Sequence, residues 1–380
     1  LAALRAQNLY RVRRVVEGPH AAALRVDGQP CINFCSNDYL GLAADPRLAD
    51  AARRALADGV GAGASALVSG YNREHAALEE ALADWLQRPR ALLFSSGWAA
   101  NLGVLKALLG KDDVLLADEL NHASLIDGGR LCGARYQRIA HGDAAGFEAA
   151  AQAAAREYPA ARRLIVTDSV FSMDGDRAPL AALQASAQRH GASLMVDDAH
   201  GFGVLGGGRG ALFETTAPMV ADVLMAGFGK ALGTAGAAVA GSEMLIEWLI
   251  QRARTWVFST APPPPLAAAS RAALAIVRSD EGAERRDRLR ALITRFRSGC
   301  AQLGIPVSAS TTAIQPLVLG AEDRALAVSR RLLERGFWVA AIRPPTVPVG
   351  TARLRITLTA AHRESEVDGL LEALVTALAS

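Results

Sequence analysis

Short apolar runs alternate with segments of helical periodicity from about residue 49 to residue 277 of this 380-residue chain. Apolar side chains that recur every three to four residues indicate helices, and short unbroken apolar runs between them indicate buried strands. Strands that alternate with helices imply crossover connections, which make neighbouring strands parallel. The pattern therefore predicts an α/β fold with a mostly parallel sheet covered by helices. The expected strands are 91–94, 114–117, 135–139, 164–167, 194–196, 223–226 and 237–240, and the helices between them include 74–86, 98–109, 180–190 and 243–252.

Both ends of the chain depart from this alternation. Near the start, 23–25 and 32–34 flank Asp27-Gly28, a pair typical of hairpin turns. After the prolines at 262–265, a helix is expected from Leu266 and over 271–303, and strands at 314–319, 338–342 and 353–358 surround two more helices. We expect an N-terminal arm and hairpin (1–40), a large α/β domain (41–277) and a smaller C-terminal α+β domain (278–380).

Charge and composition exclude several functions. The net charge of +3 is spread along the chain without a block of like charges, so neither nucleic acid nor a membrane is an expected partner. No apolar run reaches the length of a membrane span, and the first residues are polar rather than a signal peptide. The four cysteines match neither a zinc spacing nor a secreted disulfide framework, which predicts reduced thiols and a cytoplasmic protein.

Lysine is scarce, and one lysine lies in an unusual place. Of 41 basic residues only Lys106, Lys111 and Lys230 are lysines. Lys230 follows an apolar strand in a loop with glycines on both sides, where the backbone can approach a ligand closely. A desolvated lysine amine loses its proton readily and forms Schiff bases, so Lys230 is a candidate nucleophile. By itself the loop also fits an ordinary surface lysine between turn glycines.

Two adjacent carboxylates follow another buried strand, at Asp197 and Asp198, with His200 close behind. Buried carboxylates are costly unless a positive group meets them, and a protonated pyridine nitrogen is such a group. His200 could then reach a ring oxygen. Alternatively, Asp197 caps the next helix or the pair binds Mg²⁺. The chain lacks the phosphate loop that a Mg²⁺ site of this kind would accompany, so no metal is predicted.

Three further strand ends carry polar residues. Ser95-Ser96-Gly97-Trp98 runs from a strand into a helix, where free N–H groups and the helix dipole favour a phosphate. His122 follows the strand that ends near residue 118, and Ser172 follows the strand at 164–167. Each also fits a structural role, as a helix cap or a satisfied core residue. In chain order they nevertheless give a phosphate loop, a histidine, a serine, an aspartate and a lysine, which together form a coherent site.

With these motifs the chain resembles the α-oxoamine synthases, a branch of the fold-type I pyridoxal-phosphate (PLP) enzymes. The resemblance covers nearly the whole chain, and a stretch from 341 to 362 that begins Ala-Ile-Arg-Pro-Pro-Thr resembles the biotin-pathway member most closely. That likeness implies a decarboxylative condensation of L-alanine with a pimeloyl thioester, carried by CoA or by acyl carrier protein. The matching motifs are residues 36–41, 69–70, 122–124, 171–175, 196–200 and 229–230.

The resemblance also implies a role for each candidate that binds the cofactor. Lys230 would hold PLP as a Schiff base and move protons at the substrate α-carbon. Asp197 would pair with the pyridine nitrogen, His200 with the ring oxygen, and His122 would stack on the ring. Ser172 would lie near the ring oxygen. The phosphate would be held by Gly97 and Trp98.

Substrate and partner contacts are implied in the same way. Arg343 would bind the amino-acid carboxylate, because a guanidinium can hold it through two hydrogen bonds. Asn37, Arg11 and Thr346 match positions near the substrate. Ser259 and Thr260 match a segment that reaches the phosphate of a neighbouring subunit, which implies a homodimer with shared active sites.

Three positions depart from the family pattern. Gly227 stands where a Thr or Ser usually holds the phosphate, Phe258 where Tyr is common, and Trp98 where a smaller aromatic residue is common. Only Gly227 puts a property in doubt, namely the affinity for the cofactor.

Three other functions fit parts of the pattern. A glycine-using relative, such as 2-amino-3-ketobutyrate ligase (glycine C-acetyltransferase) or 5-aminolevulinate synthase, would have different residues around Arg343. An aminotransferase would share the fold and react with a keto acid. A non-catalytic partner subunit would have lost residues that are retained here, namely Lys230, Asp197 and His122.

Overall fold

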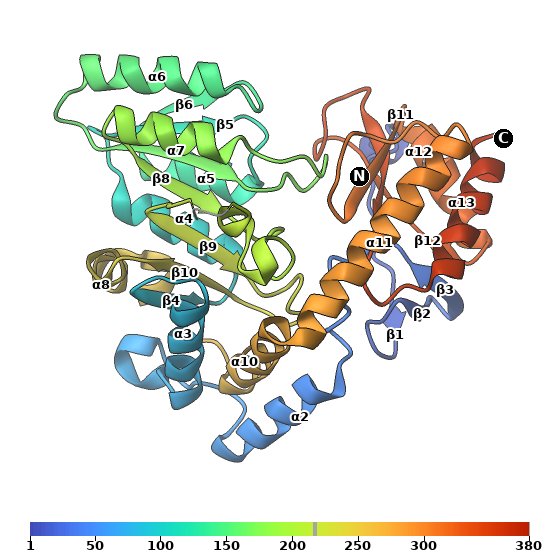
Figure 1. The fold of residues 1–380 in the computed structure, drawn as a ribbon, viewed down its shortest axis with the longest axis horizontal. Helices are drawn as coiled ribbons and strands as arrows, with labels where there is room; N and C mark the ends of the chain where they lie inside the picture. Colours follow the sequence, from blue (N-terminus) through green and yellow to red (C-terminus); the bar gives the residue numbers. More distant parts are fainter. Residues whose placement is uncertain (216–218, 380) are drawn as a thin grey trace. The chain divides into compact units, whose positions relative to one another are not determined.

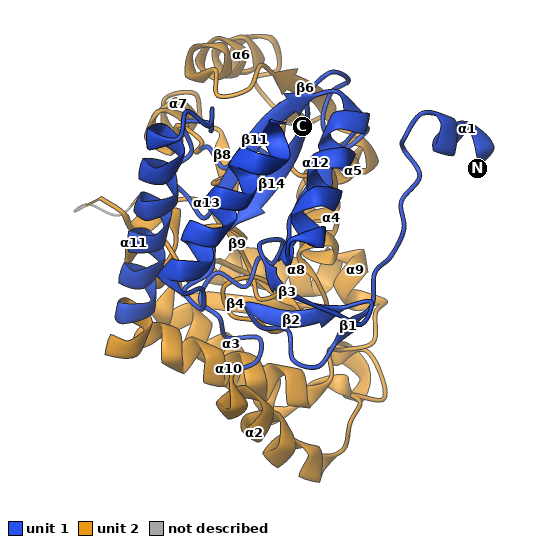
Figure 2. Ribbon diagram, turned by 90° about the vertical axis from the view of Figure 1, so that its right-hand side faces the viewer, with its two compact units in different colours: residues 1–44, 172–176, 284–380 blue, residues 45–171, 177–283 orange. Residues whose placement is uncertain are grey.

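The chain divides into two units in the computed structural model, which describes residues 1–215 and 219–379. The larger unit comprises residues 45–171 and 177–283. The smaller unit comprises residues 1–44, 172–176 and 284–380, so it gathers both ends of the chain and a short internal segment. Figure 2 colours the two units separately.

A seven-stranded sheet in the order β4-β10-β9-β8-β7-β5-β6 forms the centre of the larger unit (Figure 1). β10 is antiparallel to both of its neighbours, and the remaining neighbours are parallel. Every residue of β5, β9 and β10 is buried, which explains why these strands appear in the sequence as unbroken apolar runs. The strands are β4 (Arg90–Phe94), β5 (Val114–Asp118), β6 (Arg135–Ile139), β7 (Arg163–Asp168), β8 (Ser193–Asp197), β9 (Val223–Gly227) and β10 (Ala237–Gly241).

Helices cover this sheet. Residues of α4, α5 and α8 share one apolar cluster with the strands, and α6 and α7 pack against each other and against β7. Several of these helices begin at a side-chain cap, including Asn72, Ser96 and Ser242, which supplies a partner for a first-turn N–H group. The helices are α2 (Pro46–Ala55), α3 (Arg73–Trp85), α4 (Gly97–Leu108), α5 (Ala123–Cys132), α6 (Ala144–Glu157), α7 (Leu180–Arg189), α8 (Glu243–Arg252), α9 (Arg254–Val257) and α10 (Pro264–Arg278).

The smaller unit contains two sheets, β1-β2-β3-β12 and β11-β14-β13. Asp27 and Gly28 both have positive φ, 49° and 79°, as the predicted hairpin turn requires. β12 pairs in parallel with β3, so the N-terminal hairpin and the C-terminal segment share a sheet. The elements are α1 (Ala2–Ala6), β1 (Val16–Glu17), β2 (Ala23–Val26), β3 (Gln29–Asn33), α11 (Asp280–Gln302, which begins in the larger unit), β11 (Ile314–Gly320), α12 (Glu322–Glu334), β12 (Phe337–Trp338), β13 (Ala340–Ile342), β14 (Ala352–Thr357) and α13 (Glu364–Leu378).

The predicted α/β fold is confirmed, and two details of the sequence prediction are wrong. The single helix expected over 271–303 is broken at Ser279, whose extended backbone ends α10 and whose hydroxyl donates to the carbonyl of Ile276. The strand expected over 338–342 is divided between two sheets, as β12 and β13. The break at Ser279 is set by local hydrogen bonds, whereas the division of 338–342 depends on tertiary pairing; hydrophobic periodicity records neither.

All four cysteines are free thiols. Within the described ranges, no helix has the length and apolar character needed to cross a membrane. The same residues contain no group of three or more His, Cys, Asp or Glu side chains placed to hold a metal ion.

Candidate active site

Polar residues gather where five strands of the large sheet end. β4, β5, β7, β8 and β9 all run in one direction, so their carboxyl ends meet at one edge, where ligands of open α/β sheets bind. The residues at or just after these ends are Ser96 and Gly97, Asn121 and His122, Asp168 and Ser169, Asp197 to His200, and Gly227 to Lys230.

Asn101, from the first turns of α4, links Asp197 to the His122 segment. Its Nδ2 donates to Asp197 Oδ2 at 2.7 Å and to Ser124 Oγ at 2.8 Å. The N–H of Ala199 donates to the other Asp197 oxygen at 3.0 Å. Both carboxylate oxygens of Asp197 are therefore held, although its side chain is buried. A carboxylate fixed in this way is a rigid acceptor for a cationic donor.

His122 is fixed through the same network. Its Nδ1 lies 2.7 Å from Ser124 Oγ and also accepts the N–H of Ser124 at 3.3 Å. Since the Ser124 hydroxyl accepts from Asn101, its own hydrogen is available for Nδ1, which leaves the ring proton on Nε2. The indole of Trp98 meets the imidazole edge to face, with ring centroids 6.2 Å apart.

Asp168 supports the backbone of this segment. Its Oδ2 accepts the N–H of His122 at 2.6 Å, and its own N–H donates to Asn121 Oδ1 at 3.0 Å. Burial raises the pKa of Asp168 well above its usual value, and the charge of Asp197 raises it further. Asp168 is thus a positioning residue beneath His122.

Asp198 has a different function from Asp197, although the two are adjacent. Its carboxylate accepts from Ser169 Oγ at 2.5 Å and from the N–H of Ala211 at 3.0 Å. Burial raises the pKa of Asp198 to about 7, against the lowering effect of these hydrogen bonds. Asp198 therefore ties the loop after β8 to the 211–213 turn, and Asp197 alone faces the network of Asn101.

The charge of Lys230 acts on the same network. Burial lowers the pKa of His122, the charge of Asp197 raises it, and the charge of Lys230 lowers it further. Lys230 also lowers the pKa of Asp168. Lys230 follows the end of β9, so the sheet topology places it at the same edge as His122 and Asp197. His200 is partly buried in the loop after β8.

The turn between β4 and α4 has the form of an anion site. Ser96 Oγ accepts the N–H of Ala99 at 3.1 Å, as an N-cap does. Gly97 and Trp98 are the first residues of the helix, whose N–H groups have no acceptor within the helix. A Cβ on Gly97 would lie 3.3 Å from Met225 Cε, so a side chain there would be crowded.

Ser259 and Thr260 follow α9 and, among the described residues, form no hydrogen bond with the network above; Ser259 is half-buried. Thr260 is exposed and forms an isolated bridge with Ser65, and the N–H of Ala261 donates to the carbonyl of Ala64 at 3.0 Å. The neighbouring Phe258 is 71% exposed.

The remaining predicted residues belong to the smaller unit and form two groups. Arg355 is buried and donates to the carbonyl of Ser172 at 2.6 Å and to Asn37 Oδ1 at 3.0 Å. In the second group, Arg11 donates to Thr346 Oγ1 at 3.2 Å, and Arg343 donates to the carbonyl of Asn8.

In the second group, the pKa of Arg343 is shifted from its ordinary value. Partial burial lowers the pKa of Arg343, and the charge of Arg11 lowers it further. Two guanidinium groups close enough to repel each other favour an anion between them. This pair is consistent with a carboxylate-binding role for Arg343.

Sequence reasoning missed Asn101, Ser124, Asp168 and Arg355 as parts of these groups. Asn101 is a polar residue within an otherwise apolar helical stretch, and this could have drawn attention to it. Asp168 ends a buried strand, as Asp197 does. Arg355 alternates with apolar residues in β14, and nothing in this pattern indicated that it contacts Ser172 and Asn37.

This sheet, with its polar carboxyl edge, defines the large domain of a fold-type I PLP transferase. The chain belongs to the aminotransferase class I and II family, whose model matches residues 29–374. It is 57% identical over 382 residues to the 8-amino-7-oxononanoate synthase of Methylococcus capsulatus, covering 100% of this chain and 97% of the relative. It is 54% identical to the enzyme of the same name from Nitrosococcus oceani, covering 98% of each. A variant of serine palmitoyltransferase from S. paucimobilis, solved with a PLP–myriocin aldimine, superposes with a TM-score of 0.91 at 28% identity, covering 96% of this chain and 92% of that one.

Proposed function

We propose that this protein binds PLP and condenses L-alanine with a pimeloyl thioester, releasing CO₂, the thiol carrier and 8-amino-7-oxononanoate, a step of biotin synthesis. The observation that carries the choice of substrates is full-length identity above half to two enzymes named for this product. The same likeness disfavours the glycine-using alternatives.

The residues of the sheet edge fit PLP. Asp197 offers a buried carboxylate that is already fixed by Asn101 and Ala199, which suits the protonated pyridine nitrogen. The N–H groups of Gly97 and Trp98 suit a phosphate at a helix start. His122, as a neutral imidazole, can cover the ring without adding a charge. Bound there, the cofactor would supply an electron sink for the carbanion formed at the amino-acid α-carbon.

Side chains of the protein would carry out proton transfer and hold the substrate and the cofactor ring. The amine of Lys230, with His122 and Asp168 close enough for their pKa values to respond to it, would take and return the α-proton. Arg343 would orient the substrate carboxylate, with Arg11 and Thr346 completing that side of the site. His200 and Ser172 are proposed to contact the ring oxygen, and Asn37 the substrate.

We also propose a homodimer in the cytoplasm. Leu67, Val68 and Phe258 are 51%, 78% and 71% exposed, and they lie near the Ser65–Thr260 bridge. Exposed apolar side chains gathered around one bridge are typical of an interface. In the dimer, Ser259 and Thr260 would reach the partner's phosphate site.

The test is a substrate panel on the purified holoenzyme. Free thiol would be measured with pimeloyl-CoA, pimeloyl acyl carrier protein, acetyl-CoA or succinyl-CoA as donor and L-alanine, glycine or L-serine as acceptor. We expect thiol release with L-alanine. Turnover that requires glycine with acetyl-CoA or succinyl-CoA would contradict the proposal, and transamination of a keto acid would point to an aminotransferase.

A further inference from the structure

A cavity of about 810 Å³ lies in the larger unit, at the sheet edge opposite Asp197. Ser193 and Val223, which begin β8 and β9, and Gly241, which ends the antiparallel β10, contribute to its wall. Its other walls come from α8, from the end of α4 and from the segments before β4, β7 and β9. Figure 1 shows α8 beside β10 and β4. None of the residues assigned to the active site lines it.

Arg88 contributes a guanidinium with two unpaired donors to this cavity. Its Nε and Nη2 are buried and have no hydrogen-bond partner among the described residues. Burial lowers the pKa of Arg88, and the charge of Asp222 opposes this effect. Asp222 also lines the cavity, and its Oδ2 accepts the N–H of Leu194 at 2.8 Å rather than a hydrogen bond from Nε or Nη2 of Arg88. Buried polar groups are nearly always paired. The unpaired Nε and Nη2 of Arg88, which form a fork of two donors, therefore require an explanation.

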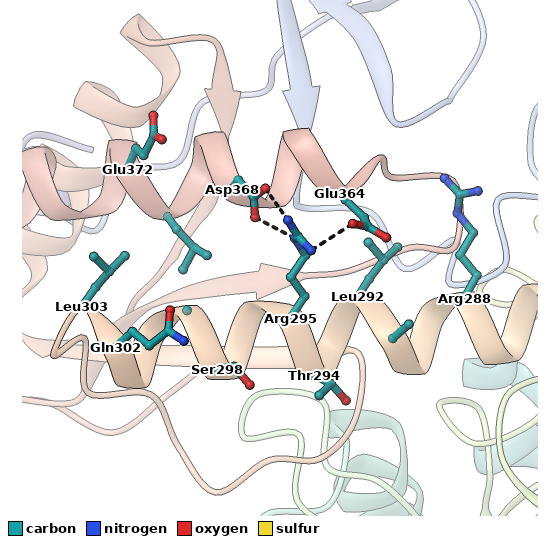
Figure 3. A pocket seen from close by; sticks show the side chains of 13 residues that line it. Arg288, Leu292, Thr294, Arg295, Ser298, Gln302, Leu303, Glu364, Asp368 and Glu372 are labelled. Carbon is teal, nitrogen blue, oxygen red and sulfur yellow. Dashed lines mark hydrogen bonds and ion pairs between the residues drawn. The ribbon is translucent and has the colours of Figure 1, made fainter.

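Two other arginines show which group the fork normally holds. Arg295 donates from Nε and Nη2 to the two oxygens of Asp368, each at 2.7 Å (Figure 3). Arg162 donates from the same two nitrogens to Asp113, at 3.1 and 2.7 Å. These nitrogens lie on one edge of the guanidinium, and their spacing matches a carboxylate. In the part of the chain that the structure describes, no carboxylate is hydrogen-bonded to this edge of Arg88.

The rest of the cavity is mainly apolar. Leu108, Leu245, Met244 and Trp248 line it, and Met244 and Trp248 are 83% and 43% exposed. The indole N–H of Trp248 donates to the carbonyl of Ala107 at 2.9 Å, which fixes the ring as a wall.

Two further charged side chains that line the cavity are already in ion pairs. Arg162 pairs with Asp113, and Glu247 pairs with Arg90. The cavity therefore combines an unpaired cationic fork with an apolar wall, and its volume is in the range of small-molecule sites.

We propose that this cavity binds an aliphatic carboxylate of medium chain length at a site separate from the active site. The carboxylate would accept from Nε and Nη2 of Arg88, and the chain would lie along Trp248, Met244 and Leu245. Because Nε and Nη2 are buried, binding requires rotation about the Cγ–Cδ and Cδ–Nε bonds of Arg88, which turns the fork into the cavity that the side chain lines.

Calorimetric titration of the holoenzyme with octanoate tests this site, with octylamine as the probe of opposite charge. We expect octanoate to bind and octylamine to bind at least about tenfold more weakly, because only octanoate complements the guanidinium. Arg88→Gln should weaken octanoate binding by roughly tenfold to a hundredfold, the effect of losing a charge-assisted pair.

Two further variants sharpen the experiment. Met244→Glu changes an exposed side chain and should weaken octanoate binding by placing a like charge on the wall. Arg130→Gln removes an equally positive surface charge, 66% exposed, that does not line the cavity, and should leave binding unchanged. Condensation activity should persist in Arg88→Gln, which separates this site from the active site.

Three results would overturn the proposal. They are no binding of octanoate by the wild type, equal binding by Arg88→Gln and the wild type, and equal binding of octanoate and octylamine. Octanoate bound only through the active site would give the second of these. If Arg88→Gln fails to fold, an unchanged affinity in Met244→Glu is sufficient to reject the site.

Discussion

Gly227 offers a quantitative test of how the cofactor phosphate is anchored. It ends β9 just before the Lys230 loop, at the position where the family resemblance implies a hydroxyl residue. Its φ is outside the left-handed region, so a side chain meets no backbone penalty there. A Cβ would, however, lie 3.1 Å from Ala199 Cβ and 3.6 Å from Ala199 Cα. The first contact is too close, and Ala199 also holds Asp197 through its N–H.

Two variants separate the crowding from the missing hydroxyl. Gly227→Ala adds only the Cβ, and overpacking of this kind costs about 1–3 kcal/mol. Because the contact needs a shift of only a few tenths of an ångström, we expect the low end, and cofactor binding about fivefold to tenfold weaker than wild type. Gly227→Ser adds the same Cβ and a hydroxyl, and a hydrogen bond to a charged group contributes about 1.5–3 kcal/mol. Serine should therefore bind the cofactor at least about tenfold more tightly than alanine, and close to or somewhat more tightly than wild type.

The assay is titration of apo-enzyme with PLP, followed by the absorbance of the bound cofactor. The turnover number of the reconstituted variants should stay close to wild type, because the phosphate is an anchor rather than a reacting group. If Gly227→Ser binds no more tightly than Gly227→Ala, a phosphate anchor at this position is refuted. If Gly227→Ala binds as tightly as wild type, the contact with Ala199 is not limiting.

Four further predictions follow from the site. Lys230→Ala should abolish turnover in a folded protein, and borohydride reduction of the wild-type holoenzyme should label Lys230 on peptide mapping; a label on either other lysine would reject the assignment. Asn101→Ala should weaken cofactor binding and lower kcat/KM by about tenfold to a hundredfold, because Asp197 loses a hydrogen bond at 2.7 Å worth about 1.5–3 kcal/mol; unchanged cofactor titration would show that Ala199 alone holds the carboxylate. Arg343→Ala should chiefly raise KM for L-alanine, whereas an equal fall in kcat and kcat/KM would mean a role confined to the transition state. The pKa of Asp198 is raised to about 7 by burial, so its contribution to stability is present below about pH 4 and is lost as pH rises through about 7; denaturant unfolding should show that loss in the wild type and less of it in Asp198→Asn.

Local patterns predicted the strands and the chain order of the site well. Every strand of the large sheet except the edge strand β6 is a short, mostly buried run, so hydrophobicity alone marked these strands within a residue or two. The site residues follow strand ends, and parallel strands bring such ends to one edge. The hairpin turn at Asp27 and Gly28 was equally visible, because both residues tolerate positive φ.

Long-range pairing was not visible from the sequence. β3 and β12 lie about 300 residues apart in the chain and share a sheet, and no local pattern predicts that partnership. For the same reason the grouping of residues 172–176 with the smaller unit was not foreseen. The domain limits at residues 40 and 277, and the individual roles of the site residues, stay predictions.

The hydrogen bonds and ion pairs of individual side chains could not be predicted from the sequence either. Asn101 became meaningful only when its amide was found between Asp197 and Ser124. Arg88 and Arg90 are alike in sequence, yet Arg90 pairs with Glu247 and the fork of Arg88 is unpaired. Such differences depend on which acceptors the fold brings close, and spacing along the chain does not record them.

The central claim is that this site joins the carbons of L-alanine and the pimeloyl chain as the alanine carboxylate is lost. The most direct measurement gives the holoenzyme carboxyl-labelled L-alanine and pimeloyl-CoA and follows label, thiol and amino ketone together. The proposed function predicts that labelled CO₂, free CoA and 8-amino-7-oxononanoate form in equal amounts, and that Lys230→Ala forms none of them. Label retained in the product, or thiol released without CO₂, would contradict it.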